Sequence, residues 1–290
     1  MKSILIVGCG DIALRVAPLL RSRYRLFGLV RNMQHAATLR ATGIIPIAGD
    51  LDHSHLARIA GLAHMILHFA PPPNSGTSDT RTRHLLAALS HGTLPERLVY
   101  ISTSGVYGDC GGARVDESHP LNPQSARAVR RADAEQRIRD WAKRNRVHAS
   151  ILRVPGIYAA ERLPLERLRT GSPAIVAEQD SHTNHVHADD LANIVVAALR
   201  RGKPNRVYHA SDDSDLKMGD YFDAVAGACH LPLPPRLPRD EVERAVSPVL
   251  WSFMNESRRL DNARMKQELK VKLRYPTVTE TLVALNKAGS

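Results

Sequence analysis

The chain of 290 residues is poor in cysteine, in aromatic residues and in long apolar runs. Its three cysteines lie far apart and form no CxxC pair, which argues against a disulfide framework and against a cysteine metal site. No stretch of about 20 consecutive apolar residues occurs, so a typical membrane-spanning helix is not expected. The first residues run directly into the apolar segment 4–7, which is too short for a signal peptide. These features predict a cytoplasmic protein without a membrane anchor.

Positive charge, in contrast, is abundant, with 40 Lys and Arg against 29 Asp and Glu and a net charge of +11. Such an excess raises the question of a polyanionic partner. Aromatic residues, which stack on nucleic-acid bases, make up 4% of the chain and are not interleaved with the basic residues. The densest basic segment, 127–146, alternates with Asp133, Glu135 and Asp140, which is typical of a solvent-exposed helix. The sequence therefore disfavours a nucleic-acid partner and favours a small molecule.

Short apolar segments alternate with helical patterns over the first half of the chain. Wholly apolar runs such as 4–7 are typical of strands buried on both faces of a parallel sheet. Helices are expected at 12–20, around 85–89 and at 125–144, and strands at 4–7, 25–30, 44–48, 65–70, 98–102 and 149–154. This alternation predicts an α/β fold with a Rossmann-type, doubly wound parallel sheet. After Val154, prolines and longer irregular segments indicate a smaller second subdomain.

A glycine turn follows the first predicted strand and opens a helix. It reads Gly8-Cys9-Gly10-Asp11-Ile12-Ala13, and this context distinguishes a dinucleotide fingerprint from a chance match. Gly8 permits the tight turn, Gly10 lets the backbone approach a pyrophosphate, and Ala13 keeps the helix close to the sheet. We expect Gly8, Gly10, Asp11 and Ile12 to hold the pyrophosphate, since a helix N-terminus offers amide donors and a favourable dipole.

The ends of the next two strands carry residues suited to an adenosine. Arg31 and Asn32 stand where an NAD-binding protein places an acid, and an arginine can clamp the 2′-phosphate of NADP. NADP is therefore favoured, with NAD as the alternative cofactor. Asp50 and Leu51 are positioned to accept the adenine amino group and to cover the ring. An ordinary surface arginine and a helix-capping aspartate are the alternative interpretations.

Four further segments have distinctive sequences: GDL at 49–51, ISTSGVYG at 101–108, ILRVPGIY at 151–158 and HVHADDLA at 185–192. With the glycine turn and RYPT at 274–277, they run in order over nearly the whole chain. On these segments the chain resembles the short-chain dehydrogenase/reductase superfamily, in its extended or atypical NAD(P)-dependent epimerase/dehydratase branch. The resemblance implies a Rossmann domain at 1–155, to which 183–210 returns, and a smaller, mainly C-terminal substrate-binding subdomain at 156–290.

The resemblance also implies further site residues and one departure. Ala70, Pro71, Ser102 and Pro155 are expected beside the cofactor, and Thr103, or Ser104 if the register differs by one, is expected at the substrate oxygen. In this family a tyrosine general acid/base and a lysine four residues later follow; the lead-in at 120–125 matches, but those two positions are Arg127 and Arg131. An arginine, with a pKa above about 12, cannot exchange a proton near neutrality. The two arginines are expected to orient substrate and cofactor, and they suit a carboxylate or phosphate.

Several alternatives remain at this stage. Tyr107 and Tyr158 are candidates for a substitute acid. His182, His185 and His187 are close in sequence, but zinc requires matched geometry and a further ligand, and His187 with Asp190 fits the family's structural step before a helix, so no metal is expected.

Two functions follow from these observations. The first is an NAD(P)-binding oxidoreductase or epimerase-like enzyme acting on a small carbonyl or hydroxyl compound, either anionic or similar to a nucleotide sugar. The second is a non-catalytic NADP-binding sensor or scaffold. Family members often pair through the helices around 80–92 and 125–144, so a homodimer is a candidate assembly, although the arginines of the second helix disfavour that face.

Overall fold

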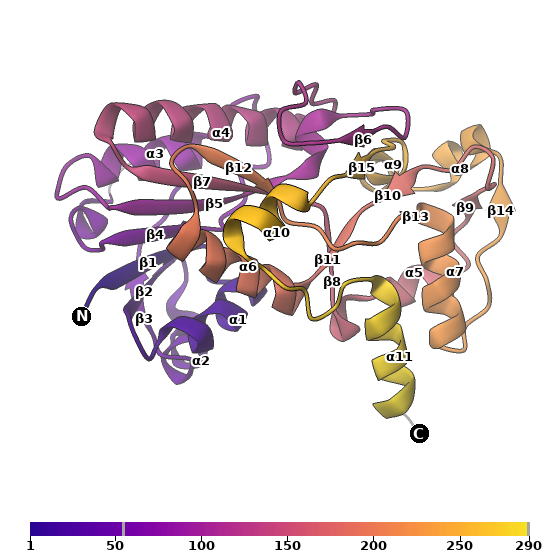
Figure 1. The fold of residues 1–290 in the computed structure, drawn as a ribbon, viewed down its shortest axis with the longest axis horizontal. Helices are drawn as coiled ribbons and strands as arrows, with labels where there is room; N and C mark the ends of the chain where they lie inside the picture. Colours follow the sequence, from indigo (N-terminus) through magenta and orange to yellow (C-terminus); the bar gives the residue numbers. More distant parts are fainter. Residues whose placement is uncertain (54–55, 289–290) are drawn as a thin grey trace.

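A seven-stranded parallel sheet forms the centre of the computed structural model, which describes residues 1–53 and 56–288 (Figure 1). Its spatial order is β12-β7-β5-β4-β1-β2-β3, and every neighbouring pair is parallel. The strands are β1 (Ser3–Val7), β2 (Arg25–Val30), β3 (Ile44–Ala48), β4 (Met65–His68), β5 (Arg97–Thr103), β7 (His148–Val154) and β12 (Arg206–His209). The strand order reverses between β1 and β4, as in doubly wound sheets. The predicted fold class is confirmed.

The fourth strand ends two residues earlier than predicted. Both Phe69 and Ala70 donate their backbone N–H to the carbonyl of Val7, at 2.7 and 2.9 Å, so the chain turns out of the ladder after His68. This turn carries Ala70 over the end of β1, where the glycine turn begins.

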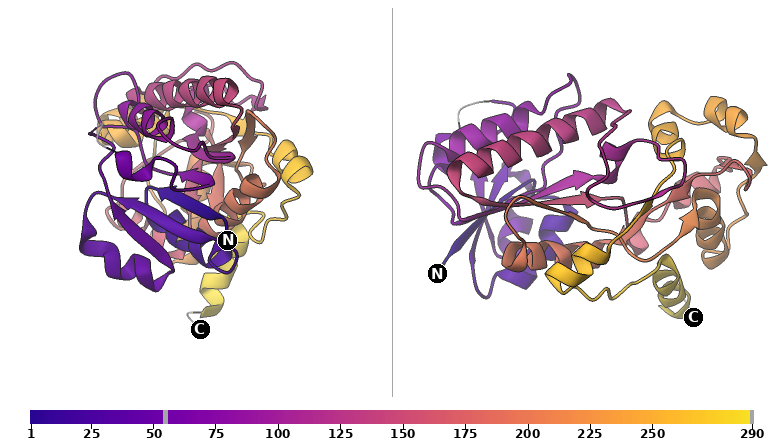
Figure 2. Two further views of the ribbon diagram at one scale, coloured as in Figure 1. Left: turned by 90° about the vertical axis from the view of Figure 1, so that its left-hand side faces the viewer. Right: turned by 45° about the horizontal axis from the view of Figure 1, so that its top comes forward.

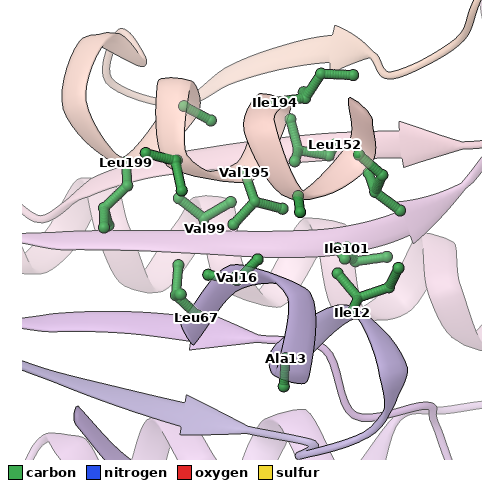
Figure 3. Close-up of a cluster of buried hydrophobic side chains, with 14 of the residues drawn as sticks. Ile12, Ala13, Val16, Leu67, Val99, Ile101, Leu152, Ile194, Val195 and Leu199 are labelled. Carbon is green, nitrogen blue, oxygen red and sulfur yellow. The ribbon is translucent and has the colours of Figure 1, made fainter. Parts of the chain in front are cut away.

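Helices cover both faces of the sheet, and each face has its own core. On one face α1 (Asp11–Leu20), α2 (Ala36–Ala41), α6 (Ala188–Arg201) and α10 (Ala263–Leu269) pack on alternate strand residues such as Ile4 and Ile6. On the other face α3 (Thr80–Leu89) and α4 (Ala126–Asn145) pack on Leu5 and Val7. This division follows from the two-residue period of a strand. Figure 3 shows Val16 of α1 and Val195 of α6 on either side of Val99 in the view, all three within this core.

A smaller body with a separate apolar core lies at the carboxyl end of the strands (Figure 2). Its helices are α5 (Leu165–Arg169), α7 (Met218–Ala228), α8 (Arg239–Ala245), α9 (Pro248–Met254) and α11 (Val278–Ala288). The short strands are β6 (Arg114–Val115), β8 (Gly156–Tyr158), β9 (Ala174–Ile175), β10 (His182–Thr183), β11 (His185–His187), β13 (Leu216–Lys217), β14 (Arg236–Leu237) and β15 (Arg259–Leu260). Along the whole described chain, the 3-10 turns are η1 (Met33–His35), η2 (Ala57–Ile59), η3 (Ser104–Tyr107) and η4 (Ala160–Arg162).

The chain crosses between the two bodies more than once. After β7 it enters the smaller body, then α6 and β12 return to the sheet, and α10 later packs beside them. Asp190 of α6 fastens the late segment, because its two carboxylate oxygens accept the backbone N–H groups of Arg274 and Tyr275 at 2.9 and 2.8 Å. Asp190 therefore holds the segment around Arg274 and Tyr275 to α6, which packs on the sheet.

A buried ion pair fastens α4 to the sheet. Glu135 of α4 and Arg153 of β7 lie 2.7 Å apart with side chains 2% and 3% exposed. Ser102 donates to Glu135 at 2.6 Å, and Arg153 donates to the hydroxyl of Tyr107 at 2.6 Å. The expectation of a fully solvated α4 is wrong at another residue, Arg130, which is buried and donates to the carbonyl of Gly76 at 2.7 Å. Burial occurs there because α4 covers the sheet while the 71–79 loop folds across its first turns.

In the part of the chain that the structure describes, no helix is both long and apolar enough to cross a membrane.

Candidate functional site

Two cavities open at the carboxyl ends of the strands. The glycine-turn cavity, of about 420 Å³, lies beside β1, β2 and β3 and includes Gly8, Arg31, Asn32, Asp50, Leu51, Ala70, Pro71 and Arg81 in its wall. The central cavity, of about 510 Å³, lies between β5, β7, α4 and the smaller body, and Ser102, Thr103, Ser104, Arg127, Arg131 and Pro155 help to line it. Thirteen of the sixteen predicted site residues therefore line one cavity or the other; the remaining three, Gly10, Asp11 and Ile12, form the start of α1.

The glycine turn has the backbone that a dinucleotide requires. Gly8 has φ +95°, and a Cβ there would lie 2.5 Å from the backbone nitrogen of Ala70. A Cβ on Gly10 would meet nothing within 4 Å, so the space above this residue is open. Gly10 is the N-cap of α1 and has no side chain to satisfy the helix's first N–H groups. The carboxylate of Asp11, in contrast, is paired with Arg15 and Arg162. Its backbone rather than its side chain is thus suited to an anionic ligand.

Arg31, Arg81 and Asp50 bring charge to the wall of the glycine-turn cavity, and both arginines pair with Asp52 beside it. Arg81 of α3 forms a bidentate contact with Asp52, with N–O distances of 2.6 and 2.7 Å. Hydrogen bonding by Arg81 holds the pKa of Asp52 below its ordinary value, against the opposing effect of burial. The predicted Arg31 is 67% exposed and lies 3.8 Å from the same carboxylate. Its guanidinium therefore remains accessible to a ligand at the lip of the cavity.

The hydroxyls of the central cavity differ in their availability. Ser102 is buried and donates to Glu135, so its hydroxyl already has a structural partner. Thr103 is half-buried at the end of β5, and its Oγ1 accepts the N–H of Gly105 at 3.3 Å. Because that bond uses a lone pair, the hydroxyl proton of Thr103 is available to a ligand. Thr103 is the better placed of the two to contact a substrate oxygen.

Arg127 and Arg131 stand four residues apart on the cavity side of α4. Arg131 donates through Nη1 to the carbonyl of Ile101 at 2.7 Å and to the hydroxyl of Tyr100 at 2.9 Å. The guanidinium of Arg127 stacks on the ring of Phe253, 4.4 Å from its centroid. Partial desolvation, and then the charge of Arg131, lower the pKa of Arg127. Both groups nevertheless stay cationic near neutral pH.

The architecture agrees with a family comparison. The family model described as NAD dependent epimerase/dehydratase family matches residues 13–211. The chain belongs to this family. It is 23% identical to dTDP-D-glucose 4,6-dehydratase from Homo sapiens over 193 residues, and 28% identical to dTDP-glucose 4,6-dehydratase from Mycobacterium tuberculosis over 193 residues. These matches cover 59% and 58% of this chain, but 55% and 57% of the relatives, so the chain spans little more than half their length.

Solved structures of other proteins share the whole fold. A functionally unknown conserved protein from Silicibacter pomeroyi superposes with a TM-score of 0.81 and 27% identity, over 100% of both chains. The dTDP-glucose 4,6-dehydratase from Bacillus anthracis, solved in complex with NAD, has a TM-score of 0.78 and 16% identity, covering 99% of this chain and 96% of the other. At that identity the second comparison supports the fold alone.

Within this epimerase/dehydratase chain, the two candidate substitute acids lie away from the central cavity. Tyr107 is buried and its hydroxyl contacts His209 and Arg153, both at 2.6 Å, and burial raises its pKa to about 12. Tyr158 donates to the carbonyl of Thr277, and burial raises its pKa as well. Among the residues that the structure describes, no tyrosine lines the cavity.

Of the three candidate histidines, His187 caps a helix, whereas His182 and His185 line the central cavity. His187 accepts the N–H of Asp189 through Nδ1 and caps α6, as expected from the family step that includes Asp190. His185 is buried against Tyr221, with ring centroids 4.1 Å apart, and burial lowers its pKa to about 4. Over residues 1–53 and 56–288, no group of three or more His, Cys, Asp or Glu could hold a metal ion.

Sequence reasoning missed four residues of the candidate site. Arg81 reaches the glycine-turn cavity from α3, while Phe253 and the Glu256–Arg258 pair enclose the central cavity from α9 and the segment after it. No motif marks these residues, because each reaches its cavity through tertiary packing far from the sequence segments that resemble the family.

Proposed function

We propose that this chain is an NADP-binding oxidoreductase or epimerase-like enzyme that acts on a small carbonyl or hydroxyl compound. One observation carries the proposal. The glycine turn opens on a cavity with two guanidinium groups, those of Arg31 and Arg81, and a second cavity with an available hydroxyl, that of Thr103, lies at the carboxyl ends of strands in the same sheet. This arrangement fits a dinucleotide extended over the start of α1.

The residues present suit each part of that cofactor. The open space above Gly10 and the unsatisfied amides of α1 suit the pyrophosphate. Asp50 and Leu51 would face the adenine, and Arg31 would bind the 2′-phosphate, with Arg81 as a second cation beside it. Pro155 and the backbone of Ser102 would border the nicotinamide end, in the central cavity. A nicotinamide cofactor, when bound, supplies or accepts a hydride.

The chain's own residues would then bind and polarise the reacting group. Thr103 would donate its hydroxyl proton in a hydrogen bond to the substrate oxygen, and the cationic Arg127 and Arg131 would stabilise negative charge that develops on this oxygen. Neither arginine releases a proton near neutral pH. We therefore propose that water, rather than a tyrosine, exchanges the proton with the substrate oxygen.

Calorimetric titration of the purified chain with NADPH, NADP, NADH and NAD tests the cofactor assignment. We expect the phosphorylated pair to bind at least about ten-fold more tightly, because hydrogen bonds to a charged group contribute about 1.5–3 kcal/mol each. Arg31→Asp should reverse this preference. An unchanged ratio would remove Arg31 from the site, and an absence of binding by all four nucleotides would refute the proposal.

One observation favours the second function, an NADP-binding sensor or scaffold: no described tyrosine lines the central cavity, where the resemblance places Arg127 and Arg131 at the positions of the family's tyrosine and lysine. The double variant Arg127→Tyr, Arg131→Lys distinguishes the two functions. A gain in reductase turnover over a panel of carbonyl compounds supports a modified enzyme. Tight cofactor binding with no gain supports the sensor.

A further inference from the structure

The arginines of the central cavity are not equally neutralised. Arg162 pairs with Asp11 at 3.0 Å, and Arg258 pairs with Glu256 at 2.7 Å. Over residues 1–53 and 56–288, neither Arg127 nor Arg131 is within ion-pair distance of a carboxylate. Arg127 and Arg131 therefore lack a direct ion-pair partner in this wall of the cavity, and Glu256 acts on Arg127 only at longer range.

These two charges are held close together at a cost. Residues four apart on a helix are neighbours, and like charges at that spacing destabilise the helix. The structure tolerates this repulsion although both side chains line one cavity, Arg127 exposed to solvent and Arg131 half-buried. An anion bound between them would remove the repulsion and supply the missing counter-charge.

Both guanidinium groups keep donors free for such an anion. Phe253 contacts the face of the Arg127 guanidinium, whereas its N–H groups lie in the guanidinium plane, so stacking leaves the donor edge open. The two contacts of Arg131 with Ile101 and Tyr100 both use Nη1, which leaves Nη2 and Nε. Two donor edges on one helix face match the two oxygens of a carboxylate.

The anion position lies beside the hydroxyl expected to contact the reacting oxygen. A Cβ placed on Gly105 would lie 3.6 Å from Thr103 Oγ1 and 3.8 Å from the Cβ of Ala128, the neighbour of Arg127. Arg131 donates to Ile101, two residues before Thr103 on β5. The hydroxyl and the first turns of α4 thus border the same part of the cavity.

On the side of the smaller body the cavity wall contains an apolar patch beside polar and charged residues such as Asn184, Glu256 and Arg258. The patch consists of Ile157, Met218, Phe222, Leu250 and Phe253. A doubly charged phosphate loses more hydration than a singly charged carboxylate beside such a wall. The apolar side chains instead suit the carbon atoms of a small organic acid.

We propose that the central cavity binds a small oxo acid or hydroxy acid, with its carboxylate at Arg127 and Arg131 and its adjacent carbonyl or hydroxyl oxygen at Thr103. This ligand is the substrate if the proposed function holds, but its binding does not require that function. A sugar linked to a nucleoside diphosphate is a poorer match. Its charged phosphates would be separated from the reacting carbon by the sugar ring, whereas Arg127 and Arg131 stand next to the proposed position of the reacting carbon.

Calorimetry on the full-length chain at fixed ionic strength tests this site with pyruvate, acetoacetate, neutral pyruvamide and inorganic phosphate as probes. At least one of the two acids should bind, and pyruvamide should bind more weakly than pyruvate. Arg127→Gln should weaken acid binding roughly ten- to hundred-fold, the effect of losing one charged hydrogen-bonding partner. Arg144→Gln, on the exposed last turn of the same helix, is the matched control and should leave binding unchanged.

Three results would overturn the inference: no binding of either acid, equal binding of pyruvate and pyruvamide, or tighter binding of phosphate than of both acids. Arg131→Lys, which keeps the charge but loses the fork, should weaken acid binding less than Arg131→Gln. If Arg131→Gln fails to fold, Arg127→Gln decides alone, since Arg127 packs chiefly on Phe253. Titration of NADPH in parallel separates the two proposals: NADPH binding without acid binding refutes only the acid site, and the reverse refutes only the cofactor assignment.

Discussion

Removal of one member of the buried Glu135–Arg153 pair should strongly destabilise the protein. Glu135→Gln keeps the size of the side chain but leaves the Arg153 guanidinium, 3% exposed, without a carboxylate. Breaking a buried pair in this way costs about 3–5 kcal/mol. That is a large part of the roughly 5–15 kcal/mol by which folded proteins are stable.

Urea denaturation followed by tryptophan fluorescence measures this loss, because Trp141 is buried in the core that α4 forms with the sheet. Arg244→Gln is the control: its pair with Asp240 has side chains 71% and 72% exposed, and such pairs contribute about 0–1 kcal/mol. The double variant Glu135→Gln, Arg153→Met should lose less stability than Glu135→Gln alone, because it leaves no buried charge unpaired. A loss in Glu135→Gln no larger than that of the control would refute the reasoning, as would a double variant less stable than the single one.

Three further predictions concern glycine, an aspartate and an arginine. Gly8→Ala should lower the urea midpoint, since its Cβ would meet the backbone of Ala70 at 2.5 Å, whereas Gly10→Ala should fold normally but bind NADPH weakly in calorimetry. Burial raises the pKa of Asp212 to about 7, so this carboxyl group holds its proton more tightly in the folded protein than in the unfolded chain. The stability that the protonated group contributes is therefore lost as the pH rises from about 4 to 7. Asp212→Asn should therefore gain stability relative to the wild type across that range, and equal urea midpoint differences at pH 5 and pH 8 would contradict this. Arg81→Met should weaken NADPH binding more than NADH binding; an equal loss for both would show that Arg81 does not bind the 2′-phosphate.

Much of the fold could be predicted from the sequence, because a buried parallel strand and the glycine turn are each marked by a few consecutive residues. The apolar run 4–7 and the turn from Gly8 onward specify a buried strand and a phosphate-binding helix start over a few residues. The residues that follow β2 and β3 could be placed together since the carboxyl ends of parallel strands share one edge of the sheet.

The rest of the site depends on contacts between distant segments. Arg81 reaches its cavity because α3 packs under the loop after β4, and Phe253 reaches Arg127 because α9 is folded over the cavity mouth. Arg130 has the same charge and helix as its exposed neighbours, yet it is buried by the loop at Gly76. Helical periodicity carries no information on which loop will cover a given turn.

The late arrival of β12 has a consequence for the order in which a newly synthesised chain folds. Six strands, β3-β2-β1-β4-β5-β7, are complete once residue 154 has emerged from the ribosome, but the edge of β7 stays unpaired until residues 206–209 follow. An unpaired edge is a template for other strands. Two buried groups also depend on β12, because Tyr107 and Glu117 form hydrogen bonds with His209 of that strand. The nascent protein is therefore most exposed to mispairing while the intervening segment of the smaller body is being made.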